Sequence, residues 1–456
     1  MNNLYSFLKF HLLPLKLIQA KLNQKQFLIL ASILVGLTAG LAAVLLKELV
    51  YYIHLIIKHD YHLKYQYYLY LLFPSIGILL TVLYIQRIRK GKLEKGNPHI
   101  LYAIEKNSSQ LPKHQMYSHL FTSALTVGFG GSAGLESPIV STGAAIGSNF
   151  AKAYNLDNYD RTLLLASGVA AGIGAVFNAP IAGVLFSIEV LLKEKNINAF
   201  IPILIAAATG TLTSKIILNE DILLSFHLQQ KFSYLNTPYY ILLGICAGLL
   251  SVYYAKIYMK IEKLYLVYKD KVWLCALSGG VFLAILIFLF PPLFGEGYDS
   301  IKILSNQMPD KLMENGIFHG FSNSNWFILF FIGCVMFLKV FATSITISSG
   351  GNGGNFAPSL FVGAYLGYFF AQIFRTFNIS TLPLSNFTIV GMSGILSGVF
   401  YAPLTAIFLI AEITGGYELI IPLIVVSVSS YIVAKYFNPM SMDEKHLSMK
   451  LTIFAY

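Results

Sequence analysis

The chain has 456 residues, of which 56% are hydrophobic and only 12% are charged. Soluble domains carry about a quarter of their residues as charges, so this composition excludes an ordinary soluble protein. Apolar runs of about 18 residues or more can cross a bilayer as helices. Such runs recur along the chain at Phe27–Leu46, Tyr67–Ile85, Tyr239–Ala255, Trp273–Phe290 and Trp326–Phe341. They predict an all-α polytopic membrane protein, because a membrane β-barrel shows short alternating strands instead.

The formal net charge is +11, and the basic residues flank the predicted spans. Under the positive-inside rule they predict a basic cytoplasmic N-terminal segment (1–26) and a short cytoplasmic tail (438–456). The loop after the second span is also predicted to be cytoplasmic, from Arg87, Arg89, Lys90, Lys92 and Lys95. These charges form no separate domain, so we expect no nucleic-acid partner. The prediction is a multi-pass protein of the cell membrane, in contact with lipid, with both termini in the cytoplasm.

The chain also contains an internal repeat, which divides it into a first half (27–219) and a second half (220–437). Gly134–Pro138, followed by a glycine five residues after the proline, matches Gly354–Pro358, which is followed by a glycine at the same distance. Later in each half an Ala-Pro pair precedes a glutamate by nine residues, ending at Glu189 and Glu412. Gly/Pro-broken helices at corresponding positions of two halves indicate a transport site near the membrane midplane.

The stretch Gly134–Pro138 predicts an anion site. Pro138 stands where a helix of small residues begins, and proline is preorganised for a first helical turn. The N-terminus of a helix attracts anions through its free N–H groups and its dipole. Glu136 stands where such an anion would bind, and a carboxylate at membrane depth is costly and usually functional. We therefore expect a tethered carboxylate that competes with a transported anion.

Taken in order, three segments resemble the CLC family of chloride channels and chloride/proton antiporters: Gly134–Pro138, Phe177–Phe186 and Gly354–Pro358. The resemblance covers roughly Phe27 to Asn438. It implies a CLC-type fold of two inverted-topology repeats with tilted and broken helices. It also implies a homodimer with a pathway in each subunit, voltage-gated or proton-coupled transport of chloride and related anions, and no enzymatic activity.

By position, the resemblance makes Glu136 the gating glutamate, which swings out when it is protonated. Backbone N–H groups around Asn355 and Phe356 would hold a central anion, and those around Leu135 and Ser137 would face an outer one. Bound chloride ions are the only ligands expected; no cofactor and no metal is implied. Paired nucleotide-binding modules of the kind that many relatives carry are not expected after the last span.

Several positions depart from the family pattern. Asn97, in the segment Gly96–Ile100, occupies the position of the inner anion-binding serine, where its amide could donate to an anion; a plain turn before Pro98 is the equal alternative. Val190 stands where the antiporters have their proton-relay glutamate, and it cannot carry a proton. The preceding acid, Glu189, would then be structural. The family's pore-lining tyrosine has no counterpart in Asn438–Asp443.

These departures favour a channel or a loosely coupled transporter, although an antiporter stays open. Because the segment Gly96–Ile100 departs from the family pattern, a fluoride/proton antiporter of the same superfamily is a second interpretation. A remote third reading is an intramembrane hydrolase, since Gly130–Gly134 matches G-x-S-x-G around Ser132. That motif requires a strand before the serine and an oriented histidine, and His119 has no acid near it in the sequence.

Overall fold

The computed structural model describes residues 19–59, 71–192, 200–219, 232–314, 316–321 and 324–453. All the regular elements in these ranges are helices, and eight of them are long and apolar enough to cross a membrane. The prediction of an all-α polytopic protein is therefore confirmed. Most of the predicted basic segment 1–26 lies outside the described residues, as does the start of the predicted second span.

The first half contains eight of the described helices, and α9 continues into a π-helical turn at Ser187–Leu191. In chain order they are α2 (Gln24–His59), α4 (Phe73–Arg87), α5 (Asn97–Lys106), α6 (Gln115–Gly128), α7 (Glu136–Ala153), α8 (Asn158–Phe177), α9 (Pro180–Phe186) and α10 (Phe200–Leu218).

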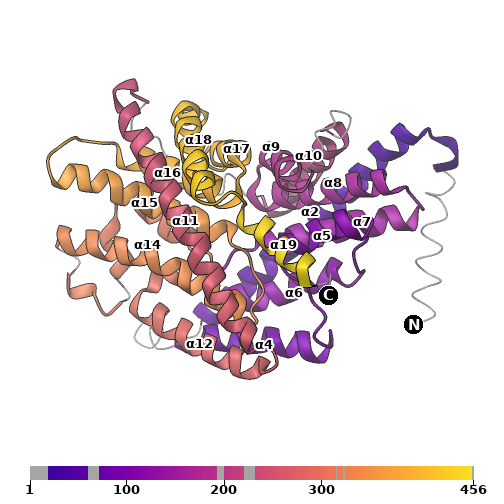
Figure 1. The fold of residues 1–456 in the computed structure, drawn as a ribbon, viewed down its shortest axis with the longest axis horizontal. Coiled ribbons are helices and arrows are strands. Elements are labelled where there is room, and N and C mark those ends of the chain that lie inside the picture. The colour runs from indigo at the N-terminus through magenta and orange to yellow at the C-terminus, as the bar shows by residue number, and fades with distance from the viewer. Residues whose placement is uncertain are drawn as a thin grey trace.

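The second half and the tail contain the remaining ones (Figure 1). They are α11 (Thr237–Val267), α12 (Val272–Leu289), α13 (Tyr298–Ser305), α14 (Asn325–Ser348), α15 (Phe356–Thr376), α16 (Leu384–Phe400), α17 (Pro403–Thr414), α18 (Ile420–Phe437) and α19 (Met442–Ile453).

The packing confirms the internal repeat. In the first half α7 packs on α8, α8 on α10 and α10 on α2; in the second, α15 packs on α16, α16 on α18 and α18 on α11. The pair α7 and α8 and its counterpart α15 and α16 both come into close backbone contact at a glycine. A Cβ at Gly147 would lie 1.9 Å from the carbonyl oxygen of Leu164, and one at Gly367 would lie 1.9 Å from that of Phe387. Glycine is required at both positions because the helices touch backbone to backbone.

The helices break where the sequence predicts. α8 ends at Asn178 and α16 at Tyr401, both with left-handed backbone (φ 53° and φ 57°), and each is followed by an Ala-Pro pair that starts the next helix. Proline at the first helical position needs no N–H partner. The two breaks are thus copies of one backbone turn.

Two segments differ from the expectation. Where a plain turn before Pro98 was one alternative, helix α5 already begins at Asn97, with Pro98 in its first turn. The tail after residue 437 is folded: α19 packs against α5 and α16, and Figure 1 shows it lying across the region between the two halves. This helix therefore belongs to the body of the protein.

Candidate functional site

The N-termini of α7 and α15 meet in the interior. Just before each helix begins, the chain forms a short antiparallel pair in which the Gly134 N–H donates to the Gly354 carbonyl (2.9 Å) and the Gly354 N–H donates to the Gly134 carbonyl (2.8 Å). Both helix N-termini are therefore held next to one another. Two such ends create a region of positive potential.

Glu136 lies in this region. It is the first residue of α7 and is only 2% exposed. The Tyr298 hydroxyl donates to its Oε1 (2.7 Å), and the N–H groups of Glu136 itself and of Ala357, in the first turn of α15, are directed at the carboxylate. Oε2 makes no hydrogen bond with the described residues. Among the predicted site residues, Glu136 is thus a buried carboxyl group that lies at the N-termini of both helices.

A second carboxylate lies beside the first. Glu296 Oε1 accepts a hydrogen bond from the Leu135 N–H (3.3 Å), so the amide expected to face an outer anion already faces a side-chain oxygen. The segment carrying Glu296 is fixed by the Lys339 ammonium, which is fully buried and donates to the Gly295 carbonyl (2.9 Å). Glu296, Tyr298 and Lys339 were not predicted as site residues from the sequence.

A cavity of about 600 Å³ reaches this site. Its wall brings together five of the predicted residues: Asn97, Glu136, Ser137, Asn355 and Phe356. The sixth, Leu135, does not line the cavity, because it lies on the side of Glu296.

Asn355 and Phe356 form the wall at the start of α15. The Tyr254 hydroxyl donates to Asn355 Oδ1 (3.2 Å). The Phe356 ring lies 5.6 Å from that of Phe177 and 5.4 Å from that of Phe400, measured between centroids. The last residues of α8 and α16 therefore both pack against the same aromatic side chain in the cavity wall.

Asn97 is neither a turn residue nor a free donor. Its side chain is 6% exposed, and Nδ2 donates to Oδ2 of Asp443 in α19 (2.8 Å). The sequence suggested that this amide contacts a bound anion; in the structure it donates to a side-chain carboxylate instead. Asp443 was not singled out from the sequence, because 346 residues separate it from Asn97.

Lys95 is a further residue of the cavity wall. Its ammonium donates to the carbonyls of Gly350 and Gly351 at 2.8 Å each, just past the end of α14. Desolvation by the surrounding protein lowers the pKa of Lys95 from 10.5 to about 8. From the sequence this lysine counted only as a topology signal, but its position places a cation beside the cavity at neutral pH.

Two other expectations concern residues away from the cavity. Val190 lies in the π-helical turn after α9 and does not line the cavity. The hydrolase reading finds no support: Ser132 follows a helix, its Oγ has no hydrogen-bond partner among the described residues, and His119 contacts Asn352 instead (Nδ1 to Nδ2, 3.3 Å).

Comparisons with known proteins agree with this geometry. The family model described as "Voltage gated chloride channel" matches residues 77–435. The H(+)/Cl(-) exchange transporter ClcA of Vibrio cholerae serotype O1 is 28% identical over 318 residues, which cover 68% of this chain and 64% of that protein. This chain thus spans less than two thirds of the length of that relative. A putative chloride channel protein ClcB-like of Ralstonia nicotianae is 27% identical over 369 residues, covering 80% of this chain and 82% of that protein.

Solved structures show the same fold at low identity. A slow cyanobacterial Cl-/H+ antiporter superposes with a TM-score of 0.78 at 23% identity, covering 94% of this chain and 99% of that one. A CLC-type fluoride/proton antiporter gives 0.75 at 22% identity, covering 92% and 97%. The fold of two inverted-topology repeats is therefore confirmed. With its family model matching most of its length, the chain belongs to the CLC family of voltage-gated chloride channels and transporters.

Proposed function

We propose that this protein exchanges chloride for protons across the membrane. The observation that carries the proposal is the position of Glu136, a buried carboxylate held between the N-termini of α7 and α15 at the wall of the cavity. The two helix N-termini form a site that suits an anion, and the carboxylate of Glu136 occupies it. A transported anion can bind there only when this carboxylate leaves.

Protonation is the event that releases Glu136. Its carboxylate accepts hydrogen bonds from the Tyr298 hydroxyl and from N–H groups at the two helix ends, and a neutral carboxyl loses most of that attraction. A proton on Glu136 therefore exchanges places with an anion at one site. This links proton movement in one direction to anion movement in the other.

The remaining groups suit a monovalent anion without strong selection. Helix N-termini and backbone N–H groups offer partial charges only, and Lys95 adds one full charge in the cavity wall. Chloride, bromide and nitrate should all pass. The proposal includes a homodimer in the cell membrane, each subunit having its own pathway, with both termini and the α5 and α19 side facing the cytoplasm.

The test is a flux assay with purified protein in liposomes. A chloride gradient is imposed without a pH gradient, valinomycin and potassium set the voltage, and external pH and chloride are followed together. Uphill proton movement driven by chloride supports an exchanger, whereas chloride flux without protons supports a channel. Glu136→Ala should abolish proton movement, while Asp299→Asn, which removes an exposed acid on α13, should behave as wild type. Unchanged anion flux and pH dependence in Glu136→Ala would show that Glu136 is not the gate.

Fluoride/proton exchange is the second candidate. It is favoured by the segment Gly96–Ile100, in which an amide bonded to Asp443 stands where the chloride-transporting pattern has a free hydroxyl. Competition between fluoride and chloride in the same liposomes separates the two. Strict preference for fluoride would replace chloride as the substrate and leave the role of Glu136 unchanged.

A further inference from the structure

The cavity that reaches Glu136 has a second group of titratable side chains in its wall. Besides Glu136 it is lined by Tyr258 and Glu262 of α11 and by Asp443 and His446 of α19. Asp443 is buried and bonded to Asn97 (2.8 Å). Val190 cannot carry a proton and does not line this cavity, whereas a proton that reaches Glu136 through the cavity passes these titratable side chains.

The Asn97 side-chain amide can form a hydrogen bond with Asp443 both when the acid is ionised and when it is protonated. The Asn97 amide donates to the carboxylate through Nδ2, while its Oδ1 is buried and has no hydrogen-bond partner among the described residues. An amide carries both a donor and an acceptor. If the amide turns over, Oδ1 accepts a hydrogen bond from the protonated acid. Gaining and losing a proton at Asp443 therefore costs no buried hydrogen bond.

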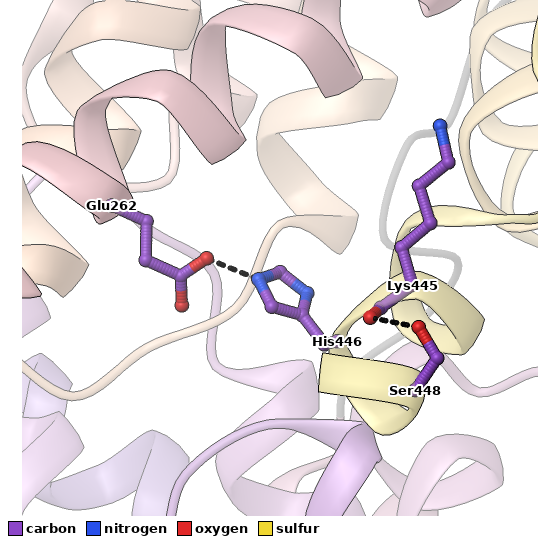
Figure 2. Close-up of polar contacts among 4 residues, drawn as sticks. All are labelled: Glu262, Lys445, His446 and Ser448. Carbon is purple, nitrogen blue, oxygen red and sulfur yellow. Dashed lines mark hydrogen bonds and ion pairs between the residues drawn. The ribbon is translucent and has the colours of Figure 1, made fainter. Parts of the chain in front are cut away.

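His446 and Glu262 face each other next to Asp443. The His446 Nε2 contacts Glu262 Oε2 directly, as Figure 2 shows. His446 lies three residues after Asp443 on α19, a spacing that puts both side chains on one face of a helix. Asp443 and His446 interact electrostatically, so the three groups form one site, which we call the α19 cluster (Glu262, Asp443 and His446).

α11 connects the α19 cluster with the start of α15. Tyr254, Tyr258 and Glu262 are spaced by four residues and lie along one face of α11. The hydroxyls of Tyr254 and Tyr258 bond with Asn355 at the N-terminus of α15, and the Tyr258 ring packs edge-on against His446 with centroids 6.1 Å apart. At 1.5 Å rise per residue, this face spans roughly 12 Å. The cavity beside it supplies the space for water between the cluster and Glu136.

We propose that Asp443, held by Asn97 and supported by the His446–Glu262 pair, is the group through which protons pass between the aqueous phase and the cavity that leads to Glu136. Asp443 takes a proton from water on its outer side, becomes neutral, and gives the proton to cavity water. No other bond forms or breaks. The inference rests on the proposed anion/proton exchange.

The surrounding charges are arranged for this role. On α19 itself the neighbours are Glu444, which is exposed, and Lys445; α5 contributes the neutral Asn97 and the buried His99 to the cavity wall. Tyr258 of α11 faces the cluster, to which α11 itself contributes Glu262. Lys263 and Lys269 line the same cavity, and so do Glu94 and Lys95 from the segment before α5. The lysines attract anions to the cavity, and Asp443 is the acid that α19 contributes to its wall.

The test compares coupling ratios, the protons moved per chloride, in the liposome assay. In Asp443→Asn the ratio should fall by about tenfold or more, because general acid–base groups contribute effects of that size, while chloride flux continues. Asp443→Glu, which restores a proton carrier, should recover most of the ratio. Glu444→Gln removes the same charge one residue along, on the exposed side, and should match wild type.

An unchanged ratio in Asp443→Asn overturns the inference. If that variant is not monodisperse, Glu262→Gln is the second test: it leaves Asp443 in place and should lower the ratio, and an unchanged ratio again overturns the inference. Failure of the proposed function looks different. If wild-type protein moves chloride without protons, both the exchanger and the role of Asp443 are wrong, whereas normal coupling in all variants removes the role of Asp443 alone.

Discussion

Glu189 and Glu412 stabilise each other's helices across the boundary between the two halves. Glu189, after α9, accepts hydrogen bonds from the N–H groups of Leu404 (3.1 Å) and Thr405 (2.7 Å) in the first turn of α17. Glu412, on α17, accepts from the N–H groups of Ile181 (3.1 Å) and Ala182 (2.8 Å) in the first turn of α9. Each acid satisfies the free N–H groups at the start of the other's helix. The acid expected to be structural at position 189 is therefore placed as a helix cap.

Removing either cap should destabilise the fold without removing transport. Glu189→Ala and Glu412→Ala should each lower the free energy of unfolding by about 1–2 kcal/mol, the usual cost of losing an N-terminal cap. The measurement is the midpoint of thermal unfolding in detergent. Glu418→Ala, an exposed acid near the end of α17, is the control and should leave the midpoint unchanged. If all three variants unfold alike, the reciprocal contact contributes nothing.

Lys95 should make anion binding depend on pH. Its pKa is lowered from 10.5 to about 8, so the ammonium is present at neutral pH and is lost as the pH rises through about 8. A unit charge at roughly 8 Å, with an effective dielectric constant near 20, contributes about 2 kcal/mol to anion attraction. We expect the apparent chloride affinity, measured by calorimetry, to weaken by about thirtyfold as the lysine deprotonates.

Two substitutions isolate that effect. Lys95→Met should bind chloride weakly at every pH, and Lys95→Arg should bind without the decline, because a guanidinium stays charged. Lys92→Met, which removes an exposed lysine three residues earlier, should keep the wild-type profile. A wild-type profile in Lys95→Met would exclude this lysine from anion binding.

Tyr298 should slow the release of Glu136. Tyr298→Phe removes the hydroxyl that donates to Oε1 (2.7 Å), and a hydrogen bond to a charged group contributes about 1.5–3 kcal/mol. The carboxylate should therefore leave its site more readily, and anion flux should rise about tenfold where this step limits transport. Tyr154→Phe is the matched control, because that hydroxyl is buried and has no hydrogen-bond partner among the described residues. Equal flux in both variants would contradict the assigned role of Tyr298.

The glycine contacts between helices should tolerate no side chain. In Gly147→Ala or Gly367→Ala the new methyl group would lie 1.9 Å from a backbone carbonyl oxygen of the facing helix. The helices would have to separate, at a cost of about 1–3 kcal/mol or more. We expect loss of monodisperse protein on size-exclusion chromatography. Gly320→Ala, with no atom within 4 Å of the new group, should purify normally.

Much of the fold could be predicted because its signals are local. The apolar runs, the Ala-Pro starts and the two matching Gly/Pro motifs are local features of the sequence, and within the described residues the structure has helices or helix starts at these positions. Glu136 was found in the same way, because its helix N-terminus is encoded in Gly134–Pro138. A repeat makes such signals stronger, since each half supports the other.

The rest of the site depends on contacts that no local pattern encodes. Asn97 was singled out as an anion ligand, but in the structure it bonds to Asp443, which comes from the far end of the chain. Lys95 looks like one more basic residue of a loop until the chain folds it against Gly350 and Gly351. Glu296 and Tyr298 lie in a polar connection between α12 and α13. Only the packing of these helices brings the two side chains next to Leu135 and Glu136.

The paired glycines Gly134 and Gly354 also constrain how the protein is made and how it works. The backbone hydrogen bonds between them join the two halves next to the N-termini of α7 and α15, beside Glu136. Neither half can assemble that place alone, so it exists only after the second half has been synthesised and inserted against the first. Once formed, it leaves the helices little freedom to shift. The moving parts of the cycle are then side chains and protons, and the amides of these two glycines should be among the slowest in the molecule to exchange with deuterium.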